Sequence, residues 1–555
     1  MAVVAIGCLD FVTQLDPRDP MNHLRTLVAS LACLACTPAF AGDEELALPR
    51  TMTDAEVEWA AKNPAAGFKA LTAPPTGPLV ATTEYSPSQA ILFGYSGTSS
   101  WKNIIALMAK HITTTANTEV WVVVTSSSQQ TDMTNRFNTN GVNMSKVRTF
   151  TLPLNSIWAR DYGPRFIHEG GCRVIVDSTY YSSRPSDDAI PAGLASQLKM
   201  TYYATDLYHS GGNYHMADGG TGYCTRLAVN DNPSKTETQI RDIFKAYYGL
   251  FTQIWTQFPF TVDSTGHVDM WFIPVGPTSV IISDWPLNSG STQDVICDAT
   301  AADMISRGWT VTRVPAFLVG GVHYTYTNAT IANSVVLIPS YTNATVTSSN
   351  ATALAAWQAA CPGKTIIQVP NENIIGASGA MHCIMMQVPT STGGDNPVTY
   401  VKNLNTAQSF SPGATVAVNW ISDHIRAISS VDIQLSTDGG SSFSTVAANE
   451  TNDGTYTWTV PDLYSTQARI RVLAKDSLGN TGGDMNDANL TINGTQLRTG
   501  DLDEDGVITG GDISVLLLDV GPCADVANCP GDLDFDGSVG ASDISLLLLS
   551  FGDPV

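Results

Sequence analysis

The sequence predicts a large α/β domain, followed by an all-β sandwich and a small acidic helical unit. Three observations lead to this prediction. From about residue 78 to 395, short apolar strands alternate with helical stretches. Between about 396 and 495, apolar and polar residues alternate with turn residues between the runs, and from 496 to 555 an acidic segment is repeated. A chain of 555 residues is long enough for two to four domains of ordinary size.

Composition and charge narrow the class of protein. Hydrophobic residues make up 43% and charged residues 14% of the chain, which is typical of globular material with a real core. The net charge of −23 argues against a nucleic-acid partner, because phosphates would be repelled. Beyond the first 41 residues no apolar run is long enough to span a bilayer.

Residues 1–41 have the layout of an upstream segment and a targeting signal. From Met21 to Ala41 the chain has one arginine, an apolar run and a terminal Ala-Phe-Ala, which is typical of a cleavable secretory signal. A buried helix is the alternative interpretation. We therefore expect a secreted or cell-surface protein, in which the Ala- and Pro-rich residues 42–77 form a loosely ordered lead-in to the first domain.

Cysteine number adds a constraint. Seven of the ten cysteines remain once the N-terminal segment is set aside. Disulfides form outside the cytoplasm, but an odd number leaves at least one thiol free. Cys523 and Cys529, which lie close together between two acidic stretches, are the candidates for a local disulfide.

Within residues 78–395 the strands and helices are predicted from apolar periodicity. The expected strands are AILFGY (90–95), VWVVVT (120–125), VIVD (174–177), SVIISDW (279–285) and SVVLIP (334–339). The expected helices are WKNIIALMAKHI (101–112) and TETQIRDIFKAYYG (236–249). Alternation of this kind indicates an α/β layer structure.

Residues 396–495 have a different pattern. The stretches VDIQLSTDGGSSFSTVA, GTYTWTVP and ARIRVLAKDSLGN alternate apolar and polar residues, with an Ig-like spacing of strands and turns. The region has no cysteine pair and no charged cluster of catalytic type, so we expect an accessory or spacer role.

The C-terminal region contains an internal repeat. DLDEDGVITGGDISVLLL recurs after 31 residues as DLDFDGSVGASDISLLLL, and each copy has acidic residues at loop positions 1, 3, 5 and 12 with glycine at position 6. Calcium takes about six to eight oxygen ligands, and this spacing wraps a loop around one ion. The expected side-chain donors are Asp501, Asp503, Asp505, Thr509 and Asp512 in the first copy, and Asp532, Asp534, Asp536 and Asp543 in the second.

The repeat has aspartate where an EF-hand has glutamate, and a helix follows each loop without one before it. In these features residues 496–555 resemble a type I dockerin, which implies structural Ca²⁺ and a cohesin partner. An acidic solvated tail is the alternative.

Four segments of the α/β region carry side chains of the kinds that take part in catalysis or metal binding: NSIWARDYGPRF (155–166), YHSGGNYHMADGGTG (208–222), TGHVDMWFIPVG (265–276) and SGAMHCIMMQ (378–387). Each is ambiguous alone. An Arg-Asp pair can be structural, a His-x-Asp sequence can be part of a metal site, and His-Cys without a second pair is a poor zinc motif. The glycine-rich segment lacks the order of a dinucleotide-binding loop.

Together these segments supply one cysteine, one histidine and two aspartates, which suit nucleophilic attack on a planar cationic carbon. A guanidinium is planar and always charged, so two carboxylates can hold it in a bidentate manner and leave its carbon open to a thiolate. A histidine can protonate the departing ammonia and then deprotonate a water molecule, since its pKa lies near the working pH.

The motifs W-x-R-D-x-G-P, G-G-N…D-G, G-H-V-D and H-C occur in order between about Glu84 and Pro389. They resemble the family of agmatine deiminases and bacterial, Porphyromonas-type peptidylarginine deiminases. The resemblance implies the pentein fold, a five-bladed α/β propeller. It also implies a hydrolase of amidine C–N bonds that needs no cofactor for catalysis and converts arginine to citrulline and ammonia through a covalent thiouronium.

The same resemblance implies roles for individual residues. Cys383 would be the nucleophile and His267 the general acid/base, and Asp161 and Asp269 would hold the guanidinium. The substrate-binding residues that it implies are Trp158, Arg184 and Asn328.

The substrate class remains open between several alternatives. The secretory signal and the Ig-like region favour a secreted protein-arginine deiminase. The relative that selects C-terminal arginine has two arginines around the Arg-Pro, whereas this chain has Arg184 alone and Ser182 in place of the other, which puts C-terminal selectivity in question. The alternatives are an agmatine deiminase, a non-catalytic arginine-binding module of a cohesin–dockerin assembly, and an amidinotransferase-like enzyme.

Overall fold

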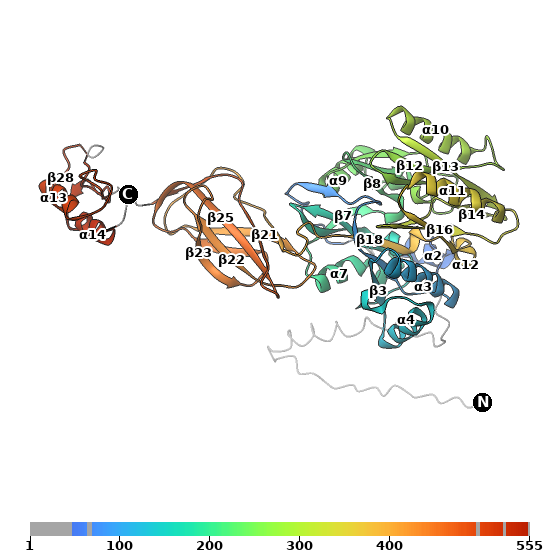
Figure 1. The fold of residues 1–555 in the computed structure, drawn as a ribbon. Coiled ribbons are helices and arrows are strands. Elements are labelled where there is room, and N and C mark those ends of the chain that lie inside the picture. Colours follow the sequence, from blue (N-terminus) through green and yellow to red (C-terminus); the bar gives the residue numbers. More distant parts are fainter. Residues whose placement is uncertain (1–46, 64–68, 495–499, 526–528, 553–555) are drawn as a thin grey trace, which may run out of the picture. The chain divides into compact units, whose positions relative to one another are not determined.

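The computed structural model describes residues 47–63, 69–494, 500–525 and 529–552. Figure 1 shows an α/β region, a β-rich region and a small helical region in chain order. The expected targeting segment lies outside the described residues. In the described ranges, no helix is both long and apolar enough to cross a membrane.

The α/β region consists of five mixed sheets that share one pattern. In each, a central strand pairs antiparallel with one neighbour and parallel with another. The central strands are β2 (Ser88–Gly94), β6 (Cys172–Thr179), β9 (Thr221–Thr225), β12 (Ser279–Asp284) and β16 (Val335–Ser340). Their antiparallel partners are β18 (Met385–Pro389), β5 (Arg165–Glu169), β8 (His215–Ala217), β11 (Phe272–Gly276) and β15 (Thr330–Ala332). Their parallel partners are β3 (Glu119–Val124), β7 (Tyr202–Tyr208), β10 (Phe251–Trp255), β13 (Thr310–Val319) and β17 (Thr365–Pro370).

Three of these sheets have a further strand at one edge, and helices connect the parallel strands. The edge strands are β1 (Leu79–Ala81), β4 (Val147–Thr151) and β14 (Val322–Thr325). The longer helices of the region are α3 (Ser99–Thr114), α4 (Ser127–Asn140), α7 (Ile190–Leu198), α9 (Glu237–Tyr248), α10 (Thr292–Ser306) and α11 (Asn350–Ala360). The single-turn helices are α5 (Ala159–Tyr162), α6 (Pro185–Asp188), α8 (Leu227–Asn230) and α12 (Glu372–Ile375).

Helix α9 illustrates why these segments fold as predicted. It begins with a capping box between Thr236 and Gln239 and ends at Gly249, whose φ of 71° suits a residue without a side chain. Ile240, Phe244 and Tyr247 are buried at a spacing of four and three residues, which gives the helix one apolar face. Each of the five strands and both helices expected in this region is present.

The last strand of the region pairs with the first central strand. β18 lies antiparallel to β2, with Met385 opposite Phe93. Both strands are almost wholly buried and apolar, so this pairing is stabilised by the hydrophobic effect as well as by hydrogen bonds. This pairing of the last strand with the first central strand brings the loop before β18 next to the start of the domain.

The β-rich region has two sheets around one apolar core. One contains β19 (Val398–Val401), β21 (Thr415–Asp423) and β24 (Thr455–Thr459). The other contains β20 (Ser409–Phe410), β22 (Ile428–Ser436), β23 (Ser444–Glu450), β25 (Tyr464–Asp476), β26 (Thr481–Met485) and β27 (Leu490–Asn493). Trp420, Ile433, Trp458 and Ile470 are buried between them. The predicted β-rich region is therefore present.

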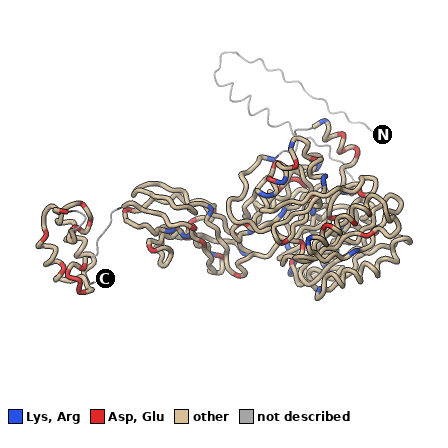
Figure 2. Tube along the Cα trace, turned by 90° about the horizontal axis from the view of Figure 1, so that it is seen from above, with Lys and Arg blue, Asp and Glu red and all other residues tan. Residues whose placement is uncertain are grey.

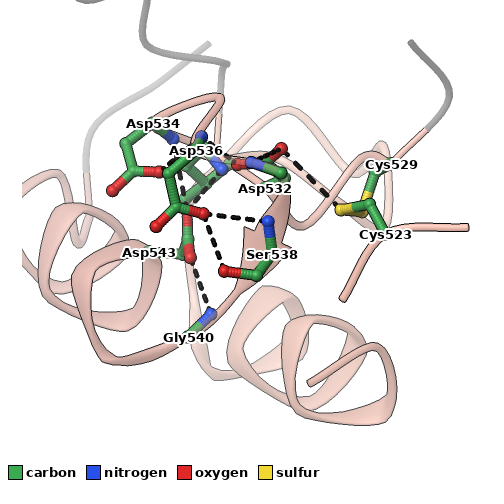
Figure 3. Close-up of a disulfide and its surroundings, with 10 residues drawn as sticks. Cys523, Cys529, Asp532, Asp534, Asp536, Ser538, Gly540 and Asp543 are labelled. Atoms are coloured by element: carbon green, nitrogen blue, oxygen red, sulfur yellow. Dashed lines mark hydrogen bonds between the residues drawn. A yellow bond between two sulfur atoms is a disulfide. The ribbon is translucent and has the colours of Figure 1, made fainter. Parts of the chain in front are cut away.

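The C-terminal region contains two helices and a short strand pair. α13 (Gly510–Leu518) and α14 (Ala541–Leu549) each follow one acidic loop, and β28 (Gly521–Pro522) pairs with β29 (Ser538–Val539). The expected disulfide between Cys523 and Cys529 is present, with the Cα atoms 5.8 Å apart (Figure 3). The five other cysteines of the described chain are free and buried.

The two acidic loops share one hydrogen-bond pattern. Asp512 accepts backbone N–H groups from Leu502 and Asp503, and Asp543 accepts the equivalent pair in the second loop. Figure 2 shows acidic but no basic positions in this region, since the chain has no Lys or Arg after Arg498.

The lead-in differs from the expectation. Residues 54–62 form helix α2 (Asp54–Lys62), which begins with a reciprocal capping box between Thr53 and Glu56. Just before it, Arg50 is only 1% exposed. The prediction of a loosely ordered segment was wrong for these residues, because capping and buried ion pairs hold them in place.

Candidate active site

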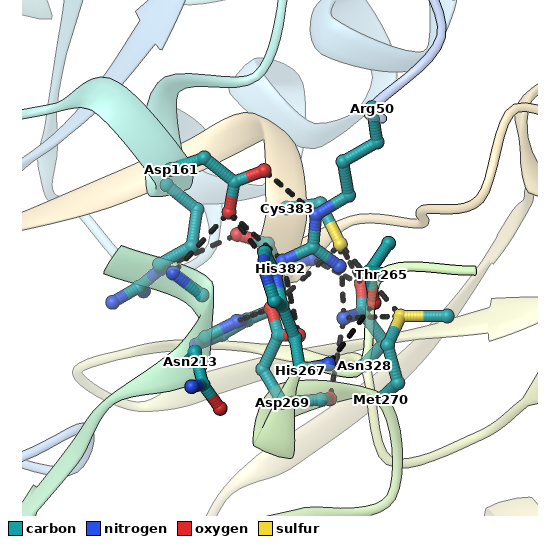
Figure 4. A network of polar contacts seen from close by, with 12 residues as sticks. Arg50, Asp161, Asn213, Thr265, His267, Asp269, Met270, Asn328, His382 and Cys383 are labelled. Atoms are coloured by element: carbon teal, nitrogen blue, oxygen red, sulfur yellow. Dashed lines mark hydrogen bonds and ion pairs between the residues drawn. The ribbon is translucent and has the colours of Figure 1, made fainter. Parts of the chain in front are cut away.

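The site is built from the segments that lead into the antiparallel strands of the five sheets. Helix α5 precedes β5, a 3-10 turn at Gly211–Asn213 precedes β8, and a second turn at Val268–Met270 precedes β11. The loop containing Asn328 precedes β15, and the turn at His382–Ile384 precedes β18. Each sheet therefore supplies one segment from the same position in its pattern, and these segments meet at one place (Figure 4).

The predicted nucleophile is wholly buried in this place. The Cys383 thiol accepts a hydrogen bond from Asn328 Nδ2 at 3.1 Å and lies 3.7 Å from Asp269 Oδ2. Burial raises the pKa of the Cys383 thiol well above its usual value, and Asp269 adds to this, whereas the nearby positive charge of Arg50 lowers it. The thiolate therefore depends on a cation beside it.

The two predicted guanidinium ligands hold a guanidinium, and it belongs to Arg50 of the same chain. Arg50 Nε donates to Asp161 Oδ2 at 2.7 Å, and Nη2 donates to Asp161 Oδ1 at 2.9 Å. Nη2 also donates to both oxygens of Asp269 at 3.0 Å. Figure 4 shows the guanidinium between the two carboxylates and beside the sulfur of Cys383.

The charge of Arg50 and the charges of Asp161 and Asp269 stabilise one another. Burial opposes the charged state of Arg50, but Asp161 and Asp269 outweigh it and raise the pKa. Burial likewise disfavours ionised Asp269, but Arg50 and then His382 lower its pKa far below the usual range. The site therefore stabilises paired carboxylates around a guanidinium.

His267 lies in the same site, close to Asp161. Its Nδ1 is 3.7 Å from Asp161 Oδ1 and is buried without a hydrogen-bond partner in the described residues. Burial, and next the charge of Arg50, lower the pKa of His267, so the ring is neutral at ordinary pH. Asn213 fixes this loop by accepting the N–H of Val268 at 3.2 Å.

A buried ionic network surrounds the four predicted residues. His382 Nδ1 lies 2.9 Å from Asp269 Oδ2, and its Nε2 lies 3.1 Å from Glu84 Oε2. Glu84 also pairs with Arg160 through two contacts of 3.2 Å and lies 3.1 Å from His215 Nδ1. His382 therefore orients Asp269, and Arg160 pairs with Glu84 rather than with the neighbouring Asp161.

The three residues expected to bind substrate lie around the same site. Trp158 Nε1 donates to the carbonyl of Leu48 at 2.9 Å. Arg184 Nη2 donates to the carbonyl of Thr51 at 2.9 Å, and its Nε donates to Glu56 at 2.7 Å. Asn328 contacts Cys383 and accepts the N–H of His382 at 3.0 Å, so it orients the predicted nucleophile.

Sequence reasoning missed Arg50, Glu84, His382 and Gly212. An ideal Cβ on Gly212 would overlap Arg50 Nη2 and lie 2.9 Å from His267 Nδ1, so the guanidinium occupies space that only glycine leaves open. The Thr-x-x-Glu sequence at Thr53 was a detectable signal for an ordered helix after Arg50. Nothing in its local sequence distinguishes Arg50 itself.

This fold and site define a hydrolase that acts on the C–N bonds of amidines. A model of the Porphyromonas-type peptidyl-arginine deiminase family matches residues 81–389, more than half of the chain, and the protein belongs to this family. Its members and their relatives deiminate guanidino groups.

Relatives support the same class. The chain is 26% identical over 290 residues to a putative agmatine deiminase of Vibrio parahaemolyticus, which covers 44% of this chain and 79% of the relative. It is 26% identical over 271 residues to a putative agmatine deiminase of Streptomyces avermitilis, covering 44% and 77%. A solved structure described as a putative agmatine deiminase superposes with a TM-score of 0.51 at 18% identity, over 58% of this chain and all of that one, and is similar in fold.

Proposed function

We propose that the protein hydrolyses the guanidinium of arginine within a peptide to citrulline and ammonia. The observation that carries this proposal is that residues 48–51 lie in the site as an arginyl peptide would. The carbonyl of Leu48 accepts from Trp158, the N–H of Arg50 donates to the carbonyl of Ala377 at 3.0 Å, and the carbonyl of Thr51 accepts from Arg184. These backbone contacts lie on both sides of the arginine.

The contacts favour peptides over small guanidines. Agmatine has the guanidinium but none of the backbone groups that meet Trp158, Ala377 and Arg184. Arg184 meets the carbonyl of the residue that follows the arginine, which indicates an internal rather than a C-terminal arginine. A buried donor left without its acceptor costs binding energy, so a substrate lacking the backbone binds less well.

In this proposal the four predicted residues have distinct roles. Asp161 and Asp269 hold the guanidinium, whose charge favours the Cys383 thiolate against the effect of burial. Neutral His267 takes the proton of the Cys383 thiol, and the thiolate attacks the guanidinium carbon. His267 then donates that proton to the departing ammonia and takes another from the hydrolytic water. Asn328 positions the sulfur, and the product leaves as citrulline.

The test compares three substrates in the Arg50→Ala variant, in which Arg50 does not compete. These are a peptide with blocked ends and an internal Arg-Thr, the same peptide ending at arginine, and agmatine. We expect kcat/KM, measured from ammonia release, to be highest for the internal arginine. A higher value for agmatine would contradict the proposal and favour agmatine deimination, which the names of the relatives suggest.

Arg184→Met in the same background is the matched control for substrate class. It removes the charged donor to the backbone carbonyl, and a hydrogen bond of this type contributes about 1.5–3 kcal/mol. We expect kcat/KM for the internal-arginine peptide to fall by about tenfold to a hundredfold. Turnover of agmatine should stay unchanged, because agmatine has no group that reaches Arg184.

We propose further that the five sheets are the five blades of a pentein propeller. The supporting observation is that each sheet has the same strand pattern and contributes one segment to the site. A solution scattering profile of residues 78–395 that departs from a closed ring of blades would contradict this arrangement.

For the C-terminal region we propose a dockerin-type unit of an exported protein that binds Ca²⁺ and a cohesin. Carboxylate oxygens of Asp501, Asp503 and Asp512 lie within 4.8 Å of one another, as do those of Asp532, Asp534 and Asp536. Hard oxygen donors of this kind fit calcium. Titration calorimetry with Ca²⁺ tests the loops, and no heat of binding would contradict the proposal.

A further inference from the structure

Residues 48–51 occupy the site in the manner of a substrate. Arg50 contacts both guanidinium ligands, and its neighbours on either side make the backbone contacts described above. We propose that Arg50 is itself deiminated by the site of its own chain, so that residues 48–56 are an intramolecular substrate. This inference rests on the proposed function.

The competing interpretation is a structural ion pair that only anchors the segment. In a structural pair the buried polar atoms find hydrogen-bond partners. Here Arg50 Nη1 and His267 Nδ1 are both buried without one among the described residues. Buried atoms without a partner also occur elsewhere in the described residues, for example at Arg184 Nη1. What distinguishes Arg50 is that its guanidinium lies beside the Cys383 sulfur, with backbone contacts on both sides of the residue.

The reaction is hydrolysis and needs water alone. Neutral His267 takes the thiol proton of Cys383, and the thiolate forms a bond to Cζ of Arg50. The bond from Cζ to one terminal nitrogen then breaks, and this nitrogen leaves as ammonia with that proton from His267. Water then gives one proton to His267 as its oxygen bonds to Cζ, the carbon–sulfur bond breaks, and the sulfur leaves as a thiolate that takes this proton back from His267. The second water proton leaves the oxygen and departs with the ammonia as ammonium. One water is consumed, one ammonia is released, and Arg50 becomes citrulline.

The product is held less well than the substrate. A ureido group is neutral, so Asp161 and Asp269, which are 4% and 1% exposed, lose the cation that compensates them. The contact between Glu56 and Arg184 lies outside the guanidinium pocket and is not changed by the reaction. We therefore expect the converted side chain to leave the pocket, which opens the site to other arginyl peptides.

The experiment measures the mass of Arg50 in the full chain. A protease that cleaves after glutamate releases residues 46–56, in which Arg50 is the only arginine. In wild-type protein we expect the mass increase that accompanies replacement of NH by oxygen, and in Cys383→Ser we expect none. Arg226, whose side chain is 53% exposed, is the internal control and should remain arginine in dilute protein.

Two further measurements separate intramolecular from intermolecular reaction. The fraction of converted Arg50 should not change when the refolding chain is diluted about a hundredfold, because a unimolecular step is independent of concentration. In a mixture with active protein, isotope-labelled Cys383→Ser chains should keep Arg50 unconverted. A fraction that falls on dilution, or conversion of the labelled chains, would contradict the intramolecular reaction.

Arg50→Lys and Arg50→Ala test the consequence for turnover. Lysine retains a positive charge in the pocket but has no guanidinium carbon, so Arg50→Lys should deiminate an added peptide more slowly than Arg50→Ala. Added peptide deiminated over many turnovers while Arg50 stays arginine would overturn this inference and leave the proposed function standing. Loss of both activities would instead overturn the proposed function.

Discussion

Gly212→Ala is the substitution that most directly tests where the guanidinium lies. Gly212 donates its N–H to Asp161 Oδ1 at 3.2 Å, and its φ is not in the left-handed region, so alanine introduces no backbone strain. The new Cβ would overlap Arg50 Nη2 and lie 2.5 Å from Asp161 Oδ1. The effect of the change is therefore confined to the space where a guanidinium binds.

The expected magnitude follows from these distances. An ordinary van der Waals contact begins at 3.4 Å, so the carboxylate of Asp161 has to move by about 0.9 Å, and the guanidinium nitrogen by more. A displacement of about 1 Å at reacting groups lowers the rate by about a hundredfold. This corresponds to about 2.7 kcal/mol of transition-state stabilisation.

The assay is ammonia release from an arginyl peptide and from agmatine, each in the Arg50→Ala background. Both substrates should lose activity equally, because they share the guanidinium. Gly376→Ala is the matched control: it lies in the loop before Cys383, has no atom within 4 Å of the added Cβ and has a helical φ of −63°. Its kcat/KM should stay within about twofold of the parent, since a surface change without contacts is nearly neutral. If Gly212→Ala melts at the same temperature as its parent and keeps its activity within about threefold, the guanidinium does not bind at this place and the reasoning fails.

Three other predictions concern pH and calcium. Because burial raises the pKa of Cys383, kcat should rise with pH through the alkaline range, and a flat profile above neutrality would contradict a buried thiol as the nucleophile. Burial, and next the charge of Arg165, lower the pKa of His209 to about 3, below its unfolded value of about 6.5, so the unfolded state binds more protons. Between about pH 7 and pH 5 the wild type should lose about 2 kcal/mol more unfolding free energy than His209→Gln, measured by urea titration, and equal losses would refute the buried neutral ring. Removal of calcium by a chelator should increase amide exchange in residues 500–552 and leave ammonia release within about twofold, whereas complete loss of turnover would place the ion in the active site.

The sequence was sufficient to predict most of the α/β region because its signals are local. A strand such as β3 is a run of apolar residues with branched side chains, and α9 has its cap, its apolar face and its terminal glycine in one continuous stretch. A fivefold repetition was implied only by the family resemblance and not by any local pattern, because strand pairing such as β18 with β2 joins residues almost 300 positions apart. That closure is set by tertiary packing, for which no local pattern exists.

The site residues likewise include some that local sequence signals predicted and some that they did not. Asp161, His267, Asp269 and Cys383 were predicted because each lies in a distinctive short motif and the chemistry requires their combination. Arg50 was missed because a single arginine in an Ala- and Pro-rich stretch has the same appearance whether it is exposed or buried.

The buried ionic network around the site could not be predicted from the sequence either. Glu84 was visible only as the start of the stretch that contains the family motifs, although it contacts Arg160, His215 and His382. An unpaired charge in the protein interior is strongly destabilising, so each buried charged side chain pairs with an oppositely charged one. Which one it pairs with depends on the tertiary structure and not on sequence spacing. The neighbouring residues Arg160 and Asp161 show this, since Arg160 pairs with Glu84 whereas Asp161 pairs with Arg50.

The charges of the site explain why a guanidinium from the protein's own chain occupies it. Two buried carboxylates and a buried thiol surround the Arg50 guanidinium, and without a cation Asp161 would lose its charged partner, at a cost of about 3–5 kcal/mol. The same absence would leave the thiol without the positive charge that lowers its pKa. A site of this kind selects cationic substrates, because the positive charge of the substrate both stabilises the two carboxylates and lowers the pKa of the predicted nucleophile. The contacts of Trp158 and Ala377 with residues 48–50 place Arg50 where it supplies that charge, and in the proposed reaction an external arginine enters once Arg50 has been converted.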